Sequence, residues 1–404
     1  MPTFDFDRAI DRRGTGALKW ELFPGDDLLP YWVADMDFVS PPAVLEALRA
    51  RVDHGVFGYA MAPASATEAA LDYLRDRHGV AAEREWIVWL PGLVPALGMA
   101  CRAAMATATA TAGAGGGSAL INTPVYPPFL HAHGEAPPMD LVKVPLAAEP
   151  LPGDRIRYGI DFAAMEQAAA AHPLRADIFC NPHNPVGRVF TEAEVREAAA
   201  FCGRHDMLFI SDEIHCDLIY DEARTPHFCA AKLGGDLAAR TVTLLAASKT
   251  YNIAGLGCAY AVIPDASLRR RFTRYLGSHG GFVPEVNALG YCATEAAYRH
   301  GEPWRRDLIE YLDANRRALE EFAAAKLPGV PLAQIEATYL AWFDLRPSGI
   351  ENPAAHLREH ARIIVSDGAN FGAPGFARFN FGCPRAMMLE GLERMARAVD
   401  GTLI

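Results

Sequence analysis

Between about residues 65 and 280 the sequence alternates amphipathic segments with short apolar runs, and this alternation limits the possible folds more than any other feature. The runs have the length and β-branched content of buried strands. They are SALINT (118–123), DIFC (177–180), MLFIS (207–211), TVTLLAA (241–247) and CAYAVI (258–263). Strands that alternate with helices favour an α/β fold built on a mostly parallel sheet flanked by helices.

Two helix starts are indicated by capping-box spacing. Ser65 and Glu68 precede ALDYLRDRHG, which Gly79 would end, and Thr191 and Glu194 precede VREAAAFCGRH. In such a box the hydroxyl and the carboxylate each accept a backbone N–H at the helix start. We therefore expect helices that begin after Ser65 and after Thr191.

The pattern changes after Pro284. Two long helical stretches (about 285–300 and 303–326) are followed by strand-like YLAWFDL, RIIVSDG and FARFNFGC and by a helix from about residue 385. A chain of 404 residues commonly forms two domains. We predict a large α/β domain of residues 46–284 and a smaller α+β domain of residues 1–45 and 285–404, in which the N-terminal segment packs against the C-terminal part.

Composition narrows the class of partner and the location. The net charge of −11, without long runs of like charge, disfavours nucleic acid and acidic membrane surfaces and favours a small-molecule or protein partner. No apolar run approaches a membrane span, and the N-terminal segment has no signal-peptide core, so a cytoplasmic location is expected. The eight scattered cysteines indicate buried thiols and no metal site. GAGGGS precedes a strand and SKT lacks a glycine-rich turn, which excludes the common nucleotide motifs.

Chemically active side chains follow four of the predicted strands. In open α/β sheets, ligands bind beyond the carboxyl ends of the strands, so these side chains could share one crevice. They are Tyr126, Asn184, Asp212 with His215, and Ser248 with Lys249.

This set of residues suits pyridoxal phosphate. The aldehyde of that cofactor needs an amine, which Lys249 offers, and its ring nitrogen needs an acid, which Asp212 offers. Asn184 can donate to the ring oxygen, and Tyr126 can cover the ring face. The turn PGLV (91–94), at the start of an expected helix, can supply backbone N–H groups to the phosphate.

The motifs VADMDF, HGVFGYA, NPHNPVGRVFT, SDEIHCDLIY, SKTYNIAGL and FARFNFGCPR occur in order along nearly the whole chain. In these motifs the sequence resembles the class I/II aminotransferase superfamily of pyridoxal-phosphate fold type I, and within it the MalY/PatB group of cystathionine β-lyases, or cysteine-S-conjugate β-lyases. The resemblance implies that the large domain binds the cofactor and that the working unit is a homodimer.

The resemblance also implies roles for individual residues. Lys249 would hold the cofactor and remove the Cα proton, and Arg378 would bind the substrate carboxylate. The other implied cofactor residues are Asp212, Asn184, Tyr126, His215, Ser248, Gly92, Leu93, Val94 and, from the neighbouring subunit, Tyr59; Asn184, Tyr126 and Asp35 would also border the substrate. Ala246, Gly257 and Leu93 depart from the common aminotransferase pattern, which leaves the phosphate partners the least defined.

Ordinary structural explanations stand beside several of these roles. Lys249 could be a solvated lysine, Asp212 a helix N-cap, and Arg378 half of a surface ion pair. Tyr126 could be a packing aromatic and Asn184 a turn residue, and His215 could be an unremarkable helix histidine; Asp35 and Asp37 could cap a turn, and His183 could be loop structure.

By resemblance, the reaction is the cleavage of L-cystathionine or a related cysteine S-conjugate to a thiol, pyruvate and ammonia. An aminotransferase shares the early chemistry and is the alternative, and a regulatory or interaction protein that retains the cofactor pocket is a further one. The loop GSHGGF (277–282) suggests a substrate pocket of modest size without an obvious second carboxylate clamp.

Overall fold

The computed structural model describes residues 4–25, 27–108, 117–131, 139–274, 276 and 286–400. The loop GSHGGF and most of the Ala/Thr/Gly-rich segment 106–118 lie outside these residues. The expectation about that loop therefore stays a prediction.

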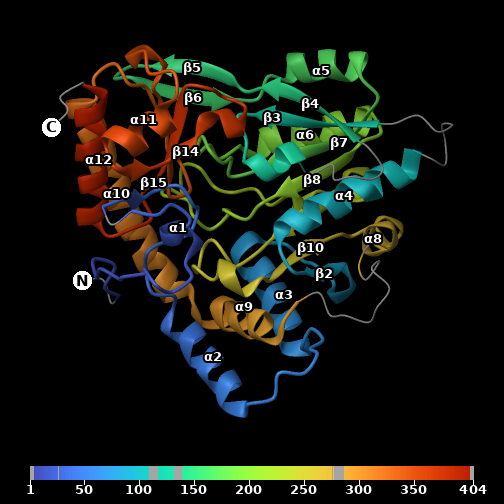
Figure 1. Ribbon diagram of the computed structural model, residues 1–404. Helices are drawn as coiled ribbons and strands as arrows, with labels where there is room; N and C mark the ends of the chain where they lie inside the picture. Colours follow the sequence, from blue (N-terminus) through green and yellow to red (C-terminus); the bar gives the residue numbers. More distant parts are fainter. Residues whose placement is uncertain are drawn as a thin grey trace.

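A seven-stranded sheet forms the centre of the molecule (Figure 1), in the order β2-β10-β9-β8-β7-β3-β4. Four neighbouring pairs are parallel, and β10 runs antiparallel to both β9 and β2. The predicted α/β class and mostly parallel sheet are confirmed, and all five predicted strands are present. The strands are β2 (Ile87–Leu90), β3 (Gly117–Thr123), β4 (Met139–Pro145), β7 (Leu174–Cys180), β8 (Leu208–Asp212), β9 (Thr241–Leu245) and β10 (Ala259–Val262).

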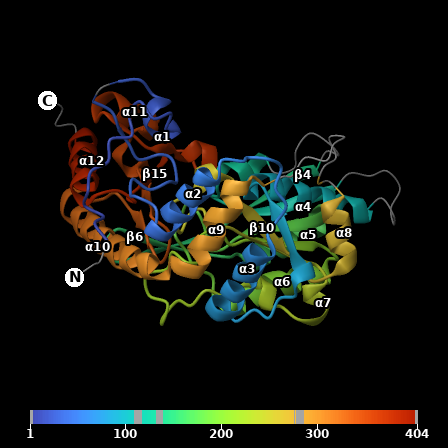
Figure 2. The same ribbon diagram turned by 90° about the horizontal axis from the view of Figure 1, so that it is seen from below.

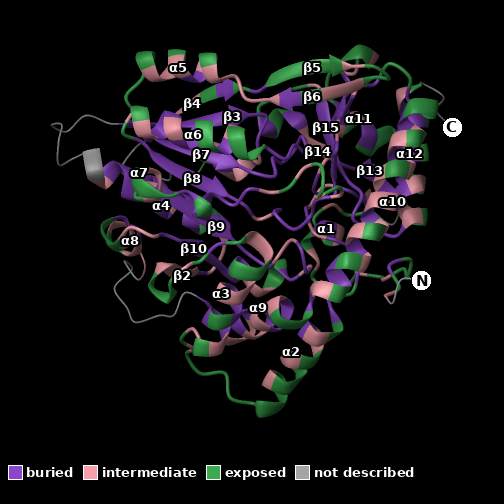
Figure 3. Cartoon of the chain, turned by 180° about the vertical axis from the view of Figure 1, so that it is seen from behind, coloured by how far each residue is buried: buried purple, intermediate pink, exposed green. Residues whose placement is uncertain are grey.

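Helices cover both faces of this sheet. The apolar helix α4 (Leu93–Ala108) packs on one face, and α5 (Phe162–Ala171) and α6 (Glu192–Arg204) pack on the other. In Figure 3 the strands between them are buried, while α5 turns an exposed face outward. Burial on both faces explains why the strand sequences are continuous apolar runs. Within the described residues, no helix is long and apolar enough to cross a membrane.

A six-stranded sheet lies beside the first, in the order β14-β15-β12-β11-β6-β5. Its hairpin, β5 (Ala147–Leu151) and β6 (Arg155–Gly159), comes from residues expected in the large domain, and β6 pairs in parallel with β11. This hairpin lies within the predicted large domain in sequence but belongs to the second sheet in space. The predicted domain boundaries therefore stay an interpretation. The remaining strands are β11 (Leu332–Ala333), β12 (Leu340–Asp344), β14 (Ser366–Asp367) and β15 (Phe376–Asn380).

The N-terminal segment packs against the C-terminal part, as Figure 2 shows from below. Strand β1 (Leu29–Pro30) pairs in parallel with β13 (Ile363–Ile364), and Phe6 packs edge-on against Trp304. The helices around this core are α1 (Leu18–Glu21), α9 (Ala288–His300), α10 (Glu302–Lys326), α11 (Pro353–His360) and α12 (Arg385–Val399). The N-terminal segment is therefore built into the core next to the second sheet.

The helix boundaries test the capping predictions. Thr191 and Glu194 form the predicted capping box at the start of α6. The prediction at Ser65 is wrong: α3 (Ala64–His78) begins after Pro63, and the Ser65 hydroxyl donates to Glu295 Oε2 at 2.9 Å instead. Pro63 is the N-cap residue, with an extended backbone, so Ser65 already lies inside the first helical turn and cannot act as the cap. The other helices are α2 (Pro42–His54), α7 (Gly235–Ala238) and α8 (Ala266–Thr273).

Candidate active site

A cavity of about 230 Å³ lies at the carboxyl ends of the central strands. Asp212 ends β8, and the cavity wall also takes residues that directly follow β3, β7 and β9. Of the predicted cofactor residues, those that line this cavity are Tyr126, Asn184, Asp212, His215, Ser248, Lys249, Gly92, Leu93 and Val94. The strand-end pattern in the sequence thus corresponds to one common site.

Lys249 is not a surface lysine. Its Nζ donates to the carbonyl oxygen of Ala34 at 2.8 Å, and the Tyr339 hydroxyl donates to the same oxygen at 2.9 Å. Burial lowers the pKa of the lysine to about 8, and nearby charges of both signs modify this effect. A large fraction of the amine is therefore neutral near pH 8, as a nucleophile or base requires.

Asp212 is buried at the end of β8 and is not a helix N-cap, because a turn follows it. One carboxylate oxygen accepts the Ile214 N–H at 3.1 Å. Burial raises the pKa of the carboxyl to about 7. A buried carboxyl with so few donors would gain stability from a cationic partner, and a protonated ring nitrogen is such a partner.

His215 lies in the same turn, not in a helix, and its ring lines the cavity. Burial lowers the pKa of this histidine to about 3, so the imidazole is neutral. Its Nδ1 is buried and has no hydrogen-bond partner among the described residues. An unpartnered nitrogen at a cavity wall is available to a bound molecule.

Arg378 is 3% exposed, which rules out a surface ion pair. Within the described part of the chain, its guanidinium donates only to neutral oxygens: Asn184 Oδ1 at 3.0 Å, the Trp32 carbonyl at 2.6 Å and Ser366 Oγ at 3.1 Å. Its buried Nε has no partner in the described part of the chain. A buried cation without an anion is a strong receptor for a carboxylate.

The start of α4 faces the cavity. Gly92 precedes the helix, which begins at Leu93, so the first N–H groups of the helix have no partner within it. A side chain at Gly257 would approach the Pro91 carbonyl oxygen to 3.2 Å, in a left-handed conformation with φ of 55°. This geometry suits an anion such as a phosphate held largely by backbone N–H groups.

The other predicted residues differ in placement. Tyr126 lines the cavity, and its N–H donates to the Asn184 carbonyl at 3.0 Å. Tyr59 is 82% exposed and lies outside the cavity wall. The Asp35 carboxylate binds Arg12 at 2.9 Å and neither caps a turn nor lines the cavity. The proposed substrate contact of Asp35 therefore has no support from this geometry.

The segment Val33–Asp37 is held over Lys249 by side-chain contacts that were not predicted from the sequence. Asn380 donates to the carbonyls of Val33 at 2.5 Å and Asp35 at 2.7 Å. The Asp37 carboxylate is buried and accepts from Lys19 at 2.6 Å and from Arg12 at 2.8 Å. Asn380 stands two residues after Arg378 on one strand, and this period of two was a signal that both side chains face the site.

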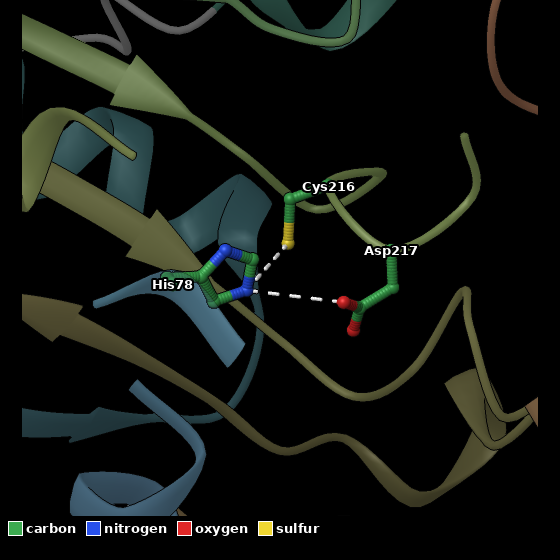
Figure 4. A group of neighbouring side chains, drawn as sticks. All are labelled: His78, Cys216 and Asp217. Atoms are coloured by element: carbon green, nitrogen blue, oxygen red, sulfur yellow. Dashed lines mark hydrogen bonds and ion pairs between the residues drawn. The ribbon is translucent and has the colours of Figure 1, made fainter. Parts of the chain in front are cut away.

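A second polar group lies behind the turn that follows Asp212. Figure 4 shows His78 directed at Cys216 and Asp217, with His78 Nε2 at 3.7 Å from the sulfur and 3.8 Å from the carboxylate. The Tyr73 hydroxyl lies between them, 2.9 Å from Nε2 and 2.6 Å from Asp217 Oδ2, and Arg77 also binds Asp217. Burial lowers the pKa of His78 to about 4. The group is a connected hydrogen-bond network that supports the turn, and we assign it no metal.

The donor set matches one cofactor. A lysine amine with a lowered pKa, a buried acid, a buried guanidinium without an acidic partner among the described residues, and a free helix start fit pyridoxal phosphate and the carboxylate of an amino acid. Together with the fold, they define a pyridoxal-phosphate enzyme of fold type I. The chain belongs to the aminotransferase class I and II family, whose sequence model matches residues 33–395.

Two curated relatives and one solved structure define the position within the family. The chain is 35% identical to "Cystathionine beta-lyase PatB" of Bacillus subtilis, over 98% of this chain and 100% of that protein. It is 32% identical to "Protein MalY" of Escherichia coli, over 98% and 99%. The crystal structure of cystalysin from Treponema denticola, which contains pyridoxal 5'-phosphate, matches with a TM-score of 0.89 and 32% identity over 99% of each chain. The resemblance to the MalY/PatB group is confirmed.

Proposed function

We propose that this enzyme is a carbon–sulfur β-lyase that cleaves L-cystathionine or a related cysteine S-conjugate to a thiol, pyruvate and ammonia. The observation that carries the proposal is the buried Arg378 guanidinium, which has only neutral partners and lines the same cavity as Lys249. Arg378 can bind the carboxylate of an amino acid and thereby place the Cα of that amino acid near the amine of Lys249. The PatB relative, named a cystathionine β-lyase, supports this reaction class.

The residues divide the work of the reaction. Bound at this site, pyridoxal phosphate supplies the carbonyl carbon that joins the substrate amine and a ring that stores the electrons of the Cα–H bond. Arg378 holds the substrate carboxylate, Asp212 keeps a positive charge on the ring nitrogen, and Asn184 donates to the ring oxygen. Asn184 has its amide group free for this, because its Oδ1 already accepts from Arg378.

Lys249 acts as the base. Its amine, with a pKa lowered to about 8 by burial, takes the Cα proton. The electron pair of the carbon–sulfur bond then leaves with the sulfur as a thiolate, and water converts the resulting enamine to pyruvate and ammonia. No oxidant or reductant is needed, since the elimination is redox-neutral.

The phosphate and the ring face complete the assignment. The N–H groups of Gly92, Leu93 and Val94 and the Ser248 hydroxyl bind the phosphate, and Tyr126 covers the ring. His215 donates or accepts at the ring edge through its free Nδ1.

The working unit we propose is a homodimer in which Tyr59 reaches the phosphate of the neighbouring subunit. Support comes from a run of exposed apolar side chains around it: Val52, Val56, Phe57, Tyr59 and Met61 are 53–82% exposed. Such a patch is typical of an interface. We further propose a cytoplasmic location, supported by cysteines that are all free thiols, as in a reducing compartment.

Complementation tests the shared site. Tyr59→Ala and Lys249→Ala homodimers should both be poorly active. Unfolding and refolding a mixture should restore activity, because one site of each hybrid then has its own Lys249 and an intact Tyr59 from the partner. Lack of recovery, with hybrid dimers shown by light scattering and mass spectrometry, would contradict the shared site.

The reaction itself is tested by incubating the holoenzyme with L-cystathionine and with S-methyl-L-cysteine, without a 2-oxo acid. Equal amounts of thiol and pyruvate are expected, and Lys249→Ala should release neither. Turnover that appears only after a 2-oxo acid is added would instead establish the aminotransferase alternative.

A further inference from the structure

A second, larger cavity opens from the cofactor cavity. Its volume is about 820 Å³, and Ala34, Tyr126 and Lys249 line both cavities. Arg378 lines the larger one. A substrate whose carboxylate binds Arg378 beside Lys249 therefore extends the rest of its side chain into this space. We call it the outer cavity.

One wall of the outer cavity is aromatic. Phe23 and Trp32 both line it and contact each other edge to face, with ring centroids 5.4 Å apart. Trp32 is held in place at two points: its Nε1 donates to the Lys19 carbonyl at 3.0 Å, and its own carbonyl accepts from Arg378 at 2.6 Å. A rigid aromatic surface thus begins next to the carboxylate arginine and suits a flat apolar group.

The outer part of this cavity carries positive charge. The Arg358 guanidinium lies over the Phe23 ring, 5.8 Å from its centroid, and Lys143 lines the same space. Neither forms an ion pair within the described ranges. Asp367 is the acid in the wall, and one of its oxygens already accepts the Ala369 N–H at 2.9 Å. The two cations Arg358 and Lys143 therefore outnumber the one acid among the described residues of the outer part.

We propose that the outer cavity binds leaving groups that combine an aromatic ring with a carboxylate, so that the substrates are cysteine S-conjugates of aromatic acids. This inference rests on the proposed lyase function and names its substrate class. The ring packs on Phe23 and Trp32, and the carboxylate binds Arg358. A zwitterionic tail would place its ammonium group in a part of the cavity where cations outnumber the one acid, Asp367, and a methyl group would leave the cavity unfilled.

The test compares kcat/KM of the holoenzyme, from pyruvate release, for S-methyl-, S-benzyl- and S-(4-carboxybenzyl)-L-cysteine and for L-cystathionine. We expect S-benzyl to exceed S-methyl by about tenfold, and S-(4-carboxybenzyl) to exceed S-benzyl by about fivefold. Phe23→Ala should lower kcat/KM about tenfold for both aryl substrates and should leave kcat/KM for S-methyl-L-cysteine within about twofold of wild type. Arg358→Gln should lower kcat/KM about fivefold for the carboxybenzyl substrate alone. Arg224→Gln, a control at an exposed arginine, should lower kcat/KM for none of the substrates.

A binding measurement separates recognition from turnover. The product thiol 4-(mercaptomethyl)benzoate should inhibit about fivefold more strongly than benzyl mercaptan, and Arg358→Gln should abolish this difference. The inference is overturned if Arg358→Gln affects all substrates equally, if S-methyl-L-cysteine matches the aryl conjugates, or if L-cystathionine is preferred. Absence of pyruvate from every conjugate would reject the lyase function itself, and this inference with it.

Discussion

Asp177, in the middle of the central strand β7, is a buried acid that the proposed chemistry does not use. It is fully buried, and neither carboxylate oxygen has a hydrogen-bond partner among the described residues. Its strand neighbours on β3 and β8 are Leu120 and Phe209, and the core around it is apolar. Burial raises the pKa of the carboxyl to about 8.

This pKa makes stability depend on pH in a defined direction. In the unfolded chain the carboxyl ionises near pH 4, whereas in the folded protein it stays protonated until about pH 8. Because the folded state holds the proton of Asp177 more tightly than the unfolded state does, the free energy of unfolding is unaffected by this group below about pH 4 and falls as pH rises toward 8. Each pH unit in that window costs about 1.4 kcal/mol, so between pH 5 and 7 the loss is about 3 kcal/mol.

Asp177→Asn removes the titration while keeping the shape. The free energy of unfolding, measured by urea titration of the holoenzyme with tryptophan fluorescence at pH 5, 6 and 7, should rise relative to wild type by about 3 kcal/mol across the series. Asp140→Asn, at an exposed position of the edge strand β4, is the matched control, and its free energy of unfolding should differ from wild type by less than about 0.5 kcal/mol. A difference between Asp177→Asn and wild type that stays constant with pH would refute the argument.

Three further outcomes are expected. Thr191→Ala removes the hydroxyl of the α6 capping box and should lower the free energy of unfolding by about 1 kcal/mol in urea titrations, and no change would mean that Glu194 caps alone. Arg378→Lys loses the two-pronged grip on the substrate carboxylate and should lower kcat/KM about 100-fold in the pyruvate assay, while an effect below about threefold would move the carboxylate elsewhere. Asp212→Asn leaves the ring nitrogen without an anion and should lower kcat about 100-fold; full activity would remove Asp212 from the site.

Five of the seven described strands of the central sheet, β3, β7, β8, β9 and β10, could be predicted because they are buried on both faces and therefore nearly all apolar. The strand β2 was missed, since IVWL directly follows the charged stretch EREW. The β5–β6 hairpin was missed for a different reason. Its sequence LAAEPLPGDRIRYG is polar, and its partner β11 lies more than 170 positions further along the chain, where local patterns carry no information about pairing.

In the candidate site, too, some residues could be predicted from the sequence and some contacts could not. Lys249, Asp212 and Asn184 were predictable because the ends of neighbouring strands share one edge of the sheet. The contact of Lys249 with Ala34 joins residues 215 positions apart, and the ion cluster of Asp37 with Lys19 and Arg12 depends on how the N-terminal segment folds back. Such contacts follow from tertiary packing, and neither propensity nor periodicity encodes them.

The hydrogen bonds from Asn380 to the carbonyls of Val33 and Asp35 have a consequence for the order in which the parts of the site are synthesised. The wall over Lys249 is made by residues 33–37, but the side chains that hold it, Arg378 and Asn380, are synthesised more than 340 residues later. A nascent chain carries the amine and the acid long before it can grip an amino-acid carboxylate. A product truncated before Arg378 would therefore keep the amine and the acid but lack the guanidinium that we propose binds the amino-acid carboxylate.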